Sequence, residues 1–70
     1  MKQDKEKLKI LSKHWVEHNE SHREEFLKWL KTTEELGESE VANEIKKTAD
    51  AMDESIRHLL NAQDIMKGEK

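Results

Sequence analysis

The sequence predicts an all-α protein, an antiparallel hairpin of two helices that dimerises into a four-helix bundle. Three observations support this fold class. Pro is absent, aromatic residues make up 4% of the 70 residues and charged residues 41%, a composition that favours helices over strands. Apolar residues recur at spacings of three and four along two long runs, which is the helical period. One turn signal, Gly37-Glu38-Ser39, separates the runs.

The first run predicts a helix from about residue 4 to residue 36. Asp4 stands near its start, where a carboxylate interacts favourably with the helix dipole. The apolar stripe consists of Leu8, Leu11, Trp15, His18, His22, Phe26, Trp29, Thr33 and Leu36. Such a stripe packs against a partner helix. His22 lies at its centre and His18 about 40° to one side, so we expect these two to be the most buried polar residues of the helix.

Residues 37–39 form the predicted turn, in which Gly37 suits a left-handed C-cap and Ser39 an N-cap. The second helix is predicted from about residue 40 to residue 67, and Gly68 ends it. Its stripe consists of Val41, Ile45, Thr48, Met52, Ile56, Leu59, Gln63 and Met66. Because the connection is short, the helices must run antiparallel. Residues 1–70 are thus expected to form one hairpin domain.

A lone hairpin would expose much of both apolar stripes, which a monomer rarely tolerates. The chain has no Cys, so disulfides cannot reinforce so small a fold. Two hairpins packed around a two-fold axis as a four-helix bundle would cover the stripes. We therefore expect a homodimer, and a larger protein partner is the alternative way to cover this surface.

Charge and hydropathy argue against two other classes of partner. The net charge is -3 with both signs mixed, and Asp4 and Glu6 interrupt the amino-terminal lysines. No aromatic residue stands among those lysines to stack on bases, so we expect no nucleic-acid binding. The sequence also lacks a long apolar run and a signal-peptide core, so we expect no membrane association and a cytoplasmic location.

Histidines provide the main functional signal. His14, His18 and His22 follow one another at intervals of four residues, so one helix stacks them on one flank. Glu25 points toward the same edge, and His58 is expected near the level of His14 on the second helix. These five residues are the candidate metal ligands. Imidazole and carboxylate donors without thiolate favour zinc, with copper, nickel or iron as alternatives.

A structural layer is the alternative role for these histidines. The rings could hydrogen-bond to one another, to Glu25, or to Thr48 and Ser55, and form a pH-sensitive polar layer in an interaction module. An unsatisfied buried polar ring costs about 1–3 kcal/mol, and metal binding is favoured because two histidines lie in the core register and a third lies on the same flank. For His58 alone, a surface position is favoured. In either case, lowering the pH through the imidazole range should destabilise the fold or release metal.

Two further functions receive less support. Haem ligation by histidine and Met52 would need a ring-sized cavity, which the charge-rich stripe does not indicate. A zinc-bound water with Glu25 or Glu17 as base would permit hydrolysis, but the sequence indicates no substrate cleft. Binding is therefore favoured over catalysis, and no catalytic residue is assigned.

The segment His14-Trp15-x-Glu17-His18-Asn19-x-x-His22-x-x-Glu25-Phe26 resembles an uncharacterised family of small prokaryotic helical domains with an HWxEHNxxHxxEF signature. The resemblance covers most of the first helix, and Gly37 and the Ala-containing second helix are similar in outline. It implies that His14, Trp15, His18, Asn19 and His22 act as one unit. It implies no activity.

Overall fold

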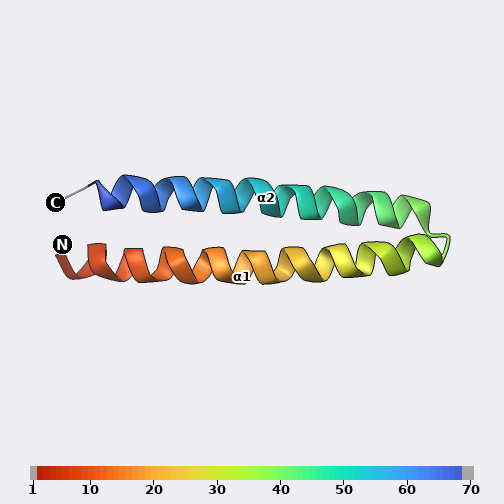
Figure 1. Cartoon of the computed structure of the whole chain (residues 1–70), viewed down its shortest axis with the longest axis horizontal. Coiled ribbons are helices and arrows are strands. Elements are labelled where there is room, and N and C mark those ends of the chain that lie inside the picture. The colour runs from red at the N-terminus through yellow and green to blue at the C-terminus, as the bar shows by residue number, and fades with distance from the viewer. Residues whose placement is uncertain (1, 69–70) are drawn as a thin grey trace.

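The structure is a computed structural model that describes residues 2–68. It consists of two α-helices, α1 (Lys2–Glu35) and α2 (Ser39–Lys67). The helices lie side by side and antiparallel, with both termini at one end (Figure 1). The Cα atoms span 52 × 14 × 13 Å, so the molecule is a long rod of nearly equal width and depth. The expected all-α hairpin is confirmed.

The turn between the helices depends on Gly37. Its φ of 77° lies in the left-handed region, which glycine adopts without a steric penalty. The Gly37 N–H donates to the carbonyl of Glu34 at 3.0 Å, and the Glu38 N–H donates to the carbonyl of Thr33 at 3.2 Å. These two bonds form a Schellman motif, which satisfies carbonyls at the end of α1. The predicted left-handed C-cap is confirmed.

The N-cap of α2 differs from the prediction. Ser39 is the first residue of α2, and Glu38 is the N-cap, without a side-chain capping bond. The Schellman motif ends with Glu38, so the chain enters the next helix directly, and the Glu38 carbonyl accepts the Ala42 N–H at 2.9 Å. The prediction of Ser39 as N-cap was wrong because the turn is one residue tighter than the sequence pattern suggested.

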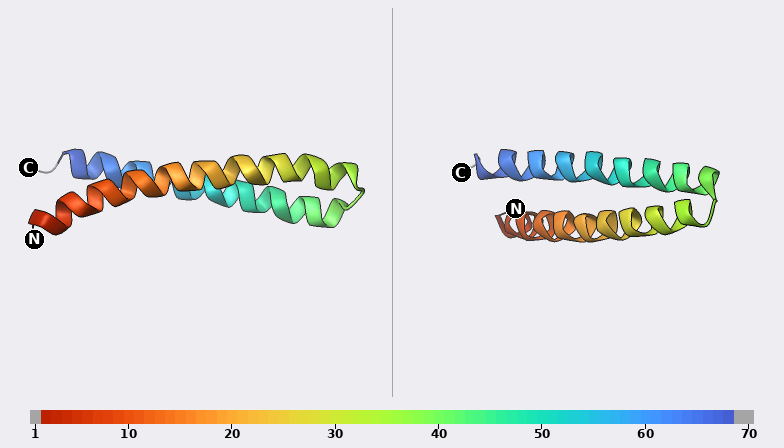
Figure 2. Two further views of the ribbon diagram at one scale, coloured as in Figure 1. Left: turned by 90° about the horizontal axis from the view of Figure 1, so that it is seen from below. Right: turned by 45° about the vertical axis from the view of Figure 1, so that its right-hand side comes forward.

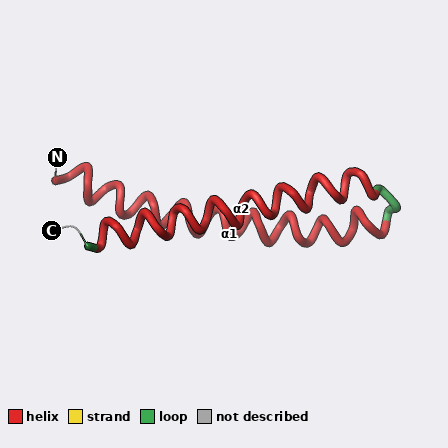
Figure 3. The backbone as a smooth tube through the Cα atoms, turned by 90° about the horizontal axis from the view of Figure 1, so that it is seen from above, coloured by secondary structure: helices red, strands yellow, loops and turns green. Residues whose placement is uncertain are grey.

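The two helices wind around each other along the rod (Figures 2 and 3). Side chains between them form a core seam, in which spacings of three and four alternate strictly. The core seam consists of Ser12, Val16, Asn19, Arg23, Phe26, Leu30 and Thr33 on α1, and Ala42, Ile45, Ala49, Met52, Ile56, Leu59, Gln63 and Met66 on α2. All of them are buried or half-buried. This is the heptad pattern of an antiparallel coiled coil.

The core seam of α1 is not the stripe that the sequence predicted. Trp15 and Trp29 remain 40% and 55% exposed. His18 is also exposed and His22 is only half-buried, so the prediction that they are the most buried polar residues of this helix was wrong for the hairpin. The seam mostly runs one residue further along α1, so that Val16, Arg23 and Leu30 lie in it, buried or half-buried, in place of Trp15, His22 and Trp29.

Ser12 and Thr33 are the most buried polar residues of α1, at 2% and 8% exposure. The Ser12 hydroxyl donates to the carbonyl of Lys9 at 2.9 Å, and the Thr33 hydroxyl donates to the carbonyl of Trp29 at 2.7 Å. A hydroxyl that bonds to the preceding turn of its own helix can be buried without an unsatisfied donor. These two positions therefore let the helices approach closely.

Two polar contacts across the core seam fix the register of the helices. The Asn19 amide donates to the Ser55 hydroxyl at 2.9 Å, and the Arg23 guanidinium forms an ion pair with the Asp53 carboxylate. Polar residues at core positions specify register, because any slip would leave them without partners. Since residue 19 lies opposite 55 and residue 23 opposite 53, residue 18 lies level with residues 56–58.

The hairpin has two unlike faces, one on each side of the core seam. A pseudo-two-fold axis perpendicular to the hairpin relates two antiparallel helices, so equivalent heptad positions of α1 and α2 fall on the same side. The histidine face carries the residues one before each core position: Leu8, Leu11, Trp15, His18, His22, Glu25, Trp29, Thr32 and Leu36 with Val41, Glu44, Thr48, Ala51, Ser55, His58, Ala62 and Ile65.

The charged face carries the residues one after each core position: Ile10, Lys13, Glu17, Glu20, Glu24, Leu27, Lys31 and Glu34 with Asn43, Lys46, Asp50, Asp53, Arg57, Leu60, Asp64 and Lys67. Most of these side chains are ionised at neutral pH. Neither α1 nor α2, over the residues described, has the length of apolar sequence needed to cross a lipid bilayer.

Candidate metal centre

The histidines of α1 form a ladder of rings along the helix. His14 stacks on His18 with ring centroids 6.0 Å apart. His18 meets His22 edge-on, with centroids 4.4 Å apart, and His22 stacks on Phe26 at 6.0 Å. Because residues four apart lie one above the other on a helix, the expected stacking on one flank is present. Phe26 belongs to the core seam, so the ladder extends from the core toward solvent.

The closest approach in this ladder joins His18 and His22. Their Nε2 atoms are 3.0 Å apart. Between two neutral rings this is a hydrogen bond in which one Nε2–H donates and the other Nε2 accepts. A tetrahedral zinc ion with Zn–N bonds of about 2.0–2.1 Å holds two of its nitrogens roughly 3.3–3.4 Å apart. To chelate an ion, the two nitrogens would have to separate by a few tenths of an ångström and both rings would have to turn so that their Nε2 lone pairs point at the ion.

The other candidate ligands lie outside this pair. His14 and Glu25 are exposed on α1, on either side of it along the helix, and His58 is exposed on α2. In the described part of the chain, no three His, Cys, Asp or Glu side chains converge in a metal-binding group. Within the described residues, a single hairpin thus brings His18 and His22 together, with His14 stacked on His18, and does not gather three candidate ligands around one point.

The surroundings of His58 are ionic. Arg57 donates to the Glu54 carboxylate at 2.8 Å. This hydrogen bond and the charge of Arg57 lower the pKa of Glu54, and His58 adds to the effect. The contacts Asn19–Ser55 and Arg23–Asp53 set residue 58 level with residues 16–18. His58 thus lies nearer the level of His18 than that of His14, where the sequence predicted it. Its ring therefore belongs to the same level of the rod as the histidine pair, on the neighbouring helix.

Asn19 is a contributor that reasoning from periodicity missed. The sequence suggested Ser55 as a partner for the histidines, but the Asn19 amide bonds to this hydroxyl. Asn19 stands between the paired histidines in sequence, and its bond to α2 fixes the rotation of α1 at this level. The signal was present in the motif, where Asn19 follows His18 directly.

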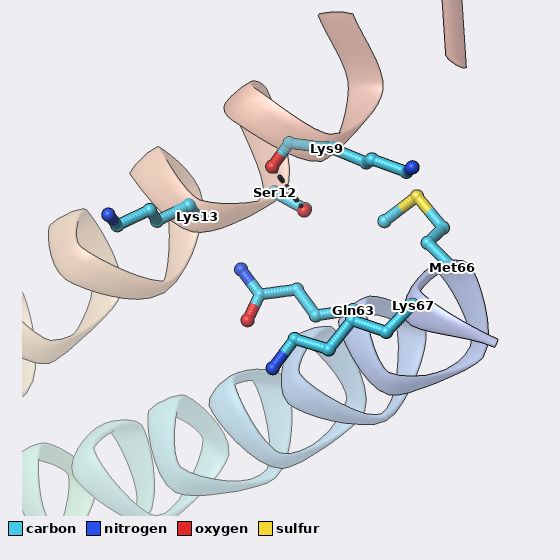
Figure 4. A pocket seen from close by; sticks show the side chains of 6 residues that line it. All are labelled: Lys9, Ser12, Lys13, Gln63, Met66 and Lys67. Atoms are coloured by element: carbon cyan, nitrogen blue, oxygen red, sulfur yellow. Dashed lines mark hydrogen bonds between the residues drawn. The ribbon is translucent and has the colours of Figure 1, made fainter. Parts of the chain in front are cut away.

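A hollow lies at the open end of the hairpin. It has a volume of about 420 Å³ and lies between Lys9, Ser12 and Lys13 of α1 and Gln63, Met66 and Lys67 of α2 (Figure 4). The ammonium groups of Lys9 and Lys13 extend in opposite directions (Figure 4). The lysines therefore do not converge on one anion, and the histidine pair remains the better candidate site.

Sequence comparison adds one finding. The model of a family described as Domain of unknown function (DUF8180) matches residues 8–66, a span that includes the whole histidine ladder and most of both helices. The chain belongs to the DUF8180 family. The expected membership in an uncharacterised domain family is confirmed. No curated protein and no solved structure matches the chain, so the candidate function of this family member depends on its own geometry.

Proposed function

We propose that the chain is a small homodimeric metal-binding protein of the cytoplasm that serves in metal handling, storage or sensing. The observation that carries the proposal is the 3.0 Å separation of the His18 and His22 Nε2 atoms on a face that α2 leaves uncovered. Two imidazoles spaced four residues apart on a rigid helix are already close to the geometry of a chelate.

Zinc is the favoured ion. The donors on the histidine face are imidazole nitrogens and carboxylate oxygens, and the chain contains no Cys, so soft thiolate chemistry is excluded. Such donors suit Zn²⁺, with Cu²⁺, Ni²⁺ and Fe²⁺ as alternatives. A zinc ion takes four ligands, and the histidine pair supplies two of them. The remaining ligands would come from water, from Glu25 or from a second chain.

Exposed apolar side chains on the same face support the dimer. Trp15, Trp29 and Leu36 are 40%, 55% and 72% exposed in the single hairpin. Removing them from water contributes about 25 cal/mol per Å² of apolar surface. Packing this face against a second hairpin would also place the histidine pair in a drier environment, where metal–ligand interactions are stronger.

The alternative is a protein-interaction module in which the histidines form a structural, pH-sensitive layer. The contact between His18 and His22 supports this alternative, because the 3.0 Å separation is a satisfied hydrogen bond that needs no ion. In this alternative, the exposed tryptophans would dock on a larger protein, and protonating both rings would remove the acceptor and break the bond.

Calorimetric titration of Zn²⁺ into untagged protein distinguishes the two functions. We expect stoichiometric zinc binding by the wild type. The zinc affinity of His18→Gln/His22→Gln should fall by more than roughly 10–100-fold, which is the usual loss when only the hydrogen-bonding partner of a metal ligand is removed. Glu20→Gln/Glu24→Gln is the matched control, because it changes two residues of α1 at the same spacing on the other side of the helix. Equal zinc affinity in the histidine variant and the wild type would overturn the metal proposal.

A further inference from the structure

The two helices contribute side chains of different size to the histidine face. On α1 the face is built from large apolar residues and histidines: Leu8, Leu11, Trp15, His18, His22, Trp29 and Leu36. The middle of α2 contributes small residues: Thr48, Ala51, Ser55 and Ala62. The face therefore has a ridge along α1 and a lower surface along α2. Such a surface can be complementary to a copy of itself.

Two hairpins can pack face to face about a two-fold axis in two ways. If the axis runs along the helices, both turns lie at the same end and α1 of each copy packs on α2 of the other. If it runs across them, the turns lie at opposite ends and each helix packs on its own counterpart. Only the first arrangement places the large residues of α1 against the small residues in the middle of α2, which allows close packing there.

The same-end arrangement also preserves the levels found within one hairpin. His18 lies level with residues 56–58, from the contacts Asn19–Ser55 and Arg23–Asp53, so it faces His58 of the second copy. The same register sets Leu11 level with residues 63–65, which include Ile65 of the histidine face. Apolar residues thus oppose apolar residues at this end, and imidazoles oppose imidazole at the centre.

The size and charge of the histidine face suit a second copy. The Cα footprint of 52 by 14 Å corresponds to about 700 Å² before side chains are added, close to the roughly 800 Å² per partner of a stable interface. Glu25 and Glu44 are its carboxylates between residues 8 and 65. In this register, Glu25 lies level with residues 49–51 and so opposes Ala51. No like charges are therefore forced together.

We propose that the second copy packs with its turn at the same end, so that His58 of one chain joins His18 and His22 of the other around a metal ion. The dimer then contains two equivalent sites of three imidazoles, each shared between the chains. This inference rests on the proposed metal-binding function and adds the identity of the third ligand. Three nitrogens with one further position for water are a common zinc arrangement.

Complementation between two inactive variants tests the shared site. His58→Gln keeps the pair, and His18→Gln/His22→Gln keeps His58. Each variant alone should fail to bind Zn²⁺ at concentrations where the wild type binds two ions per dimer. Mixed after joint unfolding and refolding, they should form dimers that bind one ion, because one complete site is restored. Circular dichroism of each variant alone verifies that it is helical, and native mass spectrometry counts the ions.

Each other outcome gives a definite answer. If His58→Gln binds zinc like the wild type while the double variant does not, the inference is overturned and the proposed function stands. If both variants lose zinc and the mixture does not regain it, the ligands come from one chain and the shared site is wrong. If the wild type binds no zinc, copper, nickel or iron, the proposed function itself fails.

A cysteine in the turn gives an independent readout of the arrangement. The chain has no Cys, so Glu38→Cys introduces a unique thiol. With both turns at one end, the two thiols lie one interhelical distance apart, roughly 8–10 Å, so a short bifunctional thiol reagent should link the two chains of a dimer in high yield. With the turns at opposite ends, the thiols would be separated by about the 52 Å length of the rod. Failure to cross-link a zinc-loaded dimer would then overturn the same-end arrangement.

Discussion

The histidine face and the charged face flank the same core seam, and each is displaced from it by a single residue. On the charged face, Ile10, Leu27 and Leu60 are exposed apolar residues that stand among many ionised neighbours. On the histidine face, Trp15 and Trp29 are exposed on either side of an imidazole pair with few charges near them. The two faces therefore lie two residues apart in the heptad, one on each side of the core seam, and the first is suited to a partner and the second to water.

The largest difference is expected when the same charge is placed in the core seam, with Ala49→Asp, and on the histidine face, with Ala51→Asp. Ala49 is 3% exposed in the core seam, and an unpaired carboxylate there costs at least about 3 kcal/mol. A domain of this size has only about 3–5 kcal/mol from its core, so Ala49→Asp should unfold. Ala51→Asp on the histidine face should remain helical and become monomeric. Circular dichroism and sedimentation equilibrium measure the two effects.

A smaller effect is expected from removing aromatic side chains on the histidine face. Trp15→Ala and Trp29→Ala should each weaken the dimer by about 2 kcal/mol, the usual cost at a central interface tryptophan, or roughly 30-fold in Kd. Leu27→Ala/Leu60→Ala is the matched control, since these residues are similarly exposed, at 41% and 45%, on the charged face. Equal weakening by both sets would mean that the two faces do not differ.

The smallest expected effect concerns ionic contacts at the surface of α2. Arg57 lowers the pKa of Glu54 through a hydrogen bond and its charge. Arg57→Gln should therefore move this pKa back toward its ordinary value, which an NMR titration of the Glu54 carboxyl would record. Because the pKa of Glu54 is lowered in the folded state, its interaction with Arg57 stabilises the fold at pH values above the ordinary pKa of Glu. This contribution is lost as the pH falls through the lowered pKa. An unchanged titration would contradict the pairing.

Much of the fold could be predicted from the sequence, because its signals are local. Gly37 is the one residue between two uninterrupted helical runs that tolerates a left-handed conformation, so it located the turn. The helix ends came within two residues of the structure. The cap at Ser39 was mispredicted because the Schellman motif takes up Glu38, and this depends on hydrogen bonds that residue preferences do not reveal.

The rotation of α1 was harder to predict. This helix carries two heptad patterns side by side: one includes Trp15, His22 and Trp29, and the other includes Val16, Arg23 and Leu30. Residue size favoured the first as the core. The hairpin covers the second, in which Val16 is buried and Arg23 and Leu30 are half-buried. Only the pairing of both helices determines which pattern is covered, so the exposure of His18 did not follow from α1 alone.

The contact between His18 and His22 was predicted from the sequence, and metal binding by these residues stays a prediction. The four-residue spacing of His18 and His22 was enough to place their rings together. The register that sets His58 at the same level depends on Asn19 and Arg23 contacts across the core seam. Such contacts between positions far apart in the chain cannot be derived from helical spacing.

Native mass spectrometry of untagged protein, before and after separate additions of Zn²⁺, Cu²⁺, Ni²⁺ and Fe²⁺ (the last without oxygen), tests the central claim most directly. It records assembly and bound metal in one spectrum. The account predicts a dimer that takes up discrete zinc ions and a His18→Gln/His22→Gln variant that takes up none. A dimer indifferent to all four ions would contradict the metal site, and a monomer at every concentration would contradict the role of the histidine face.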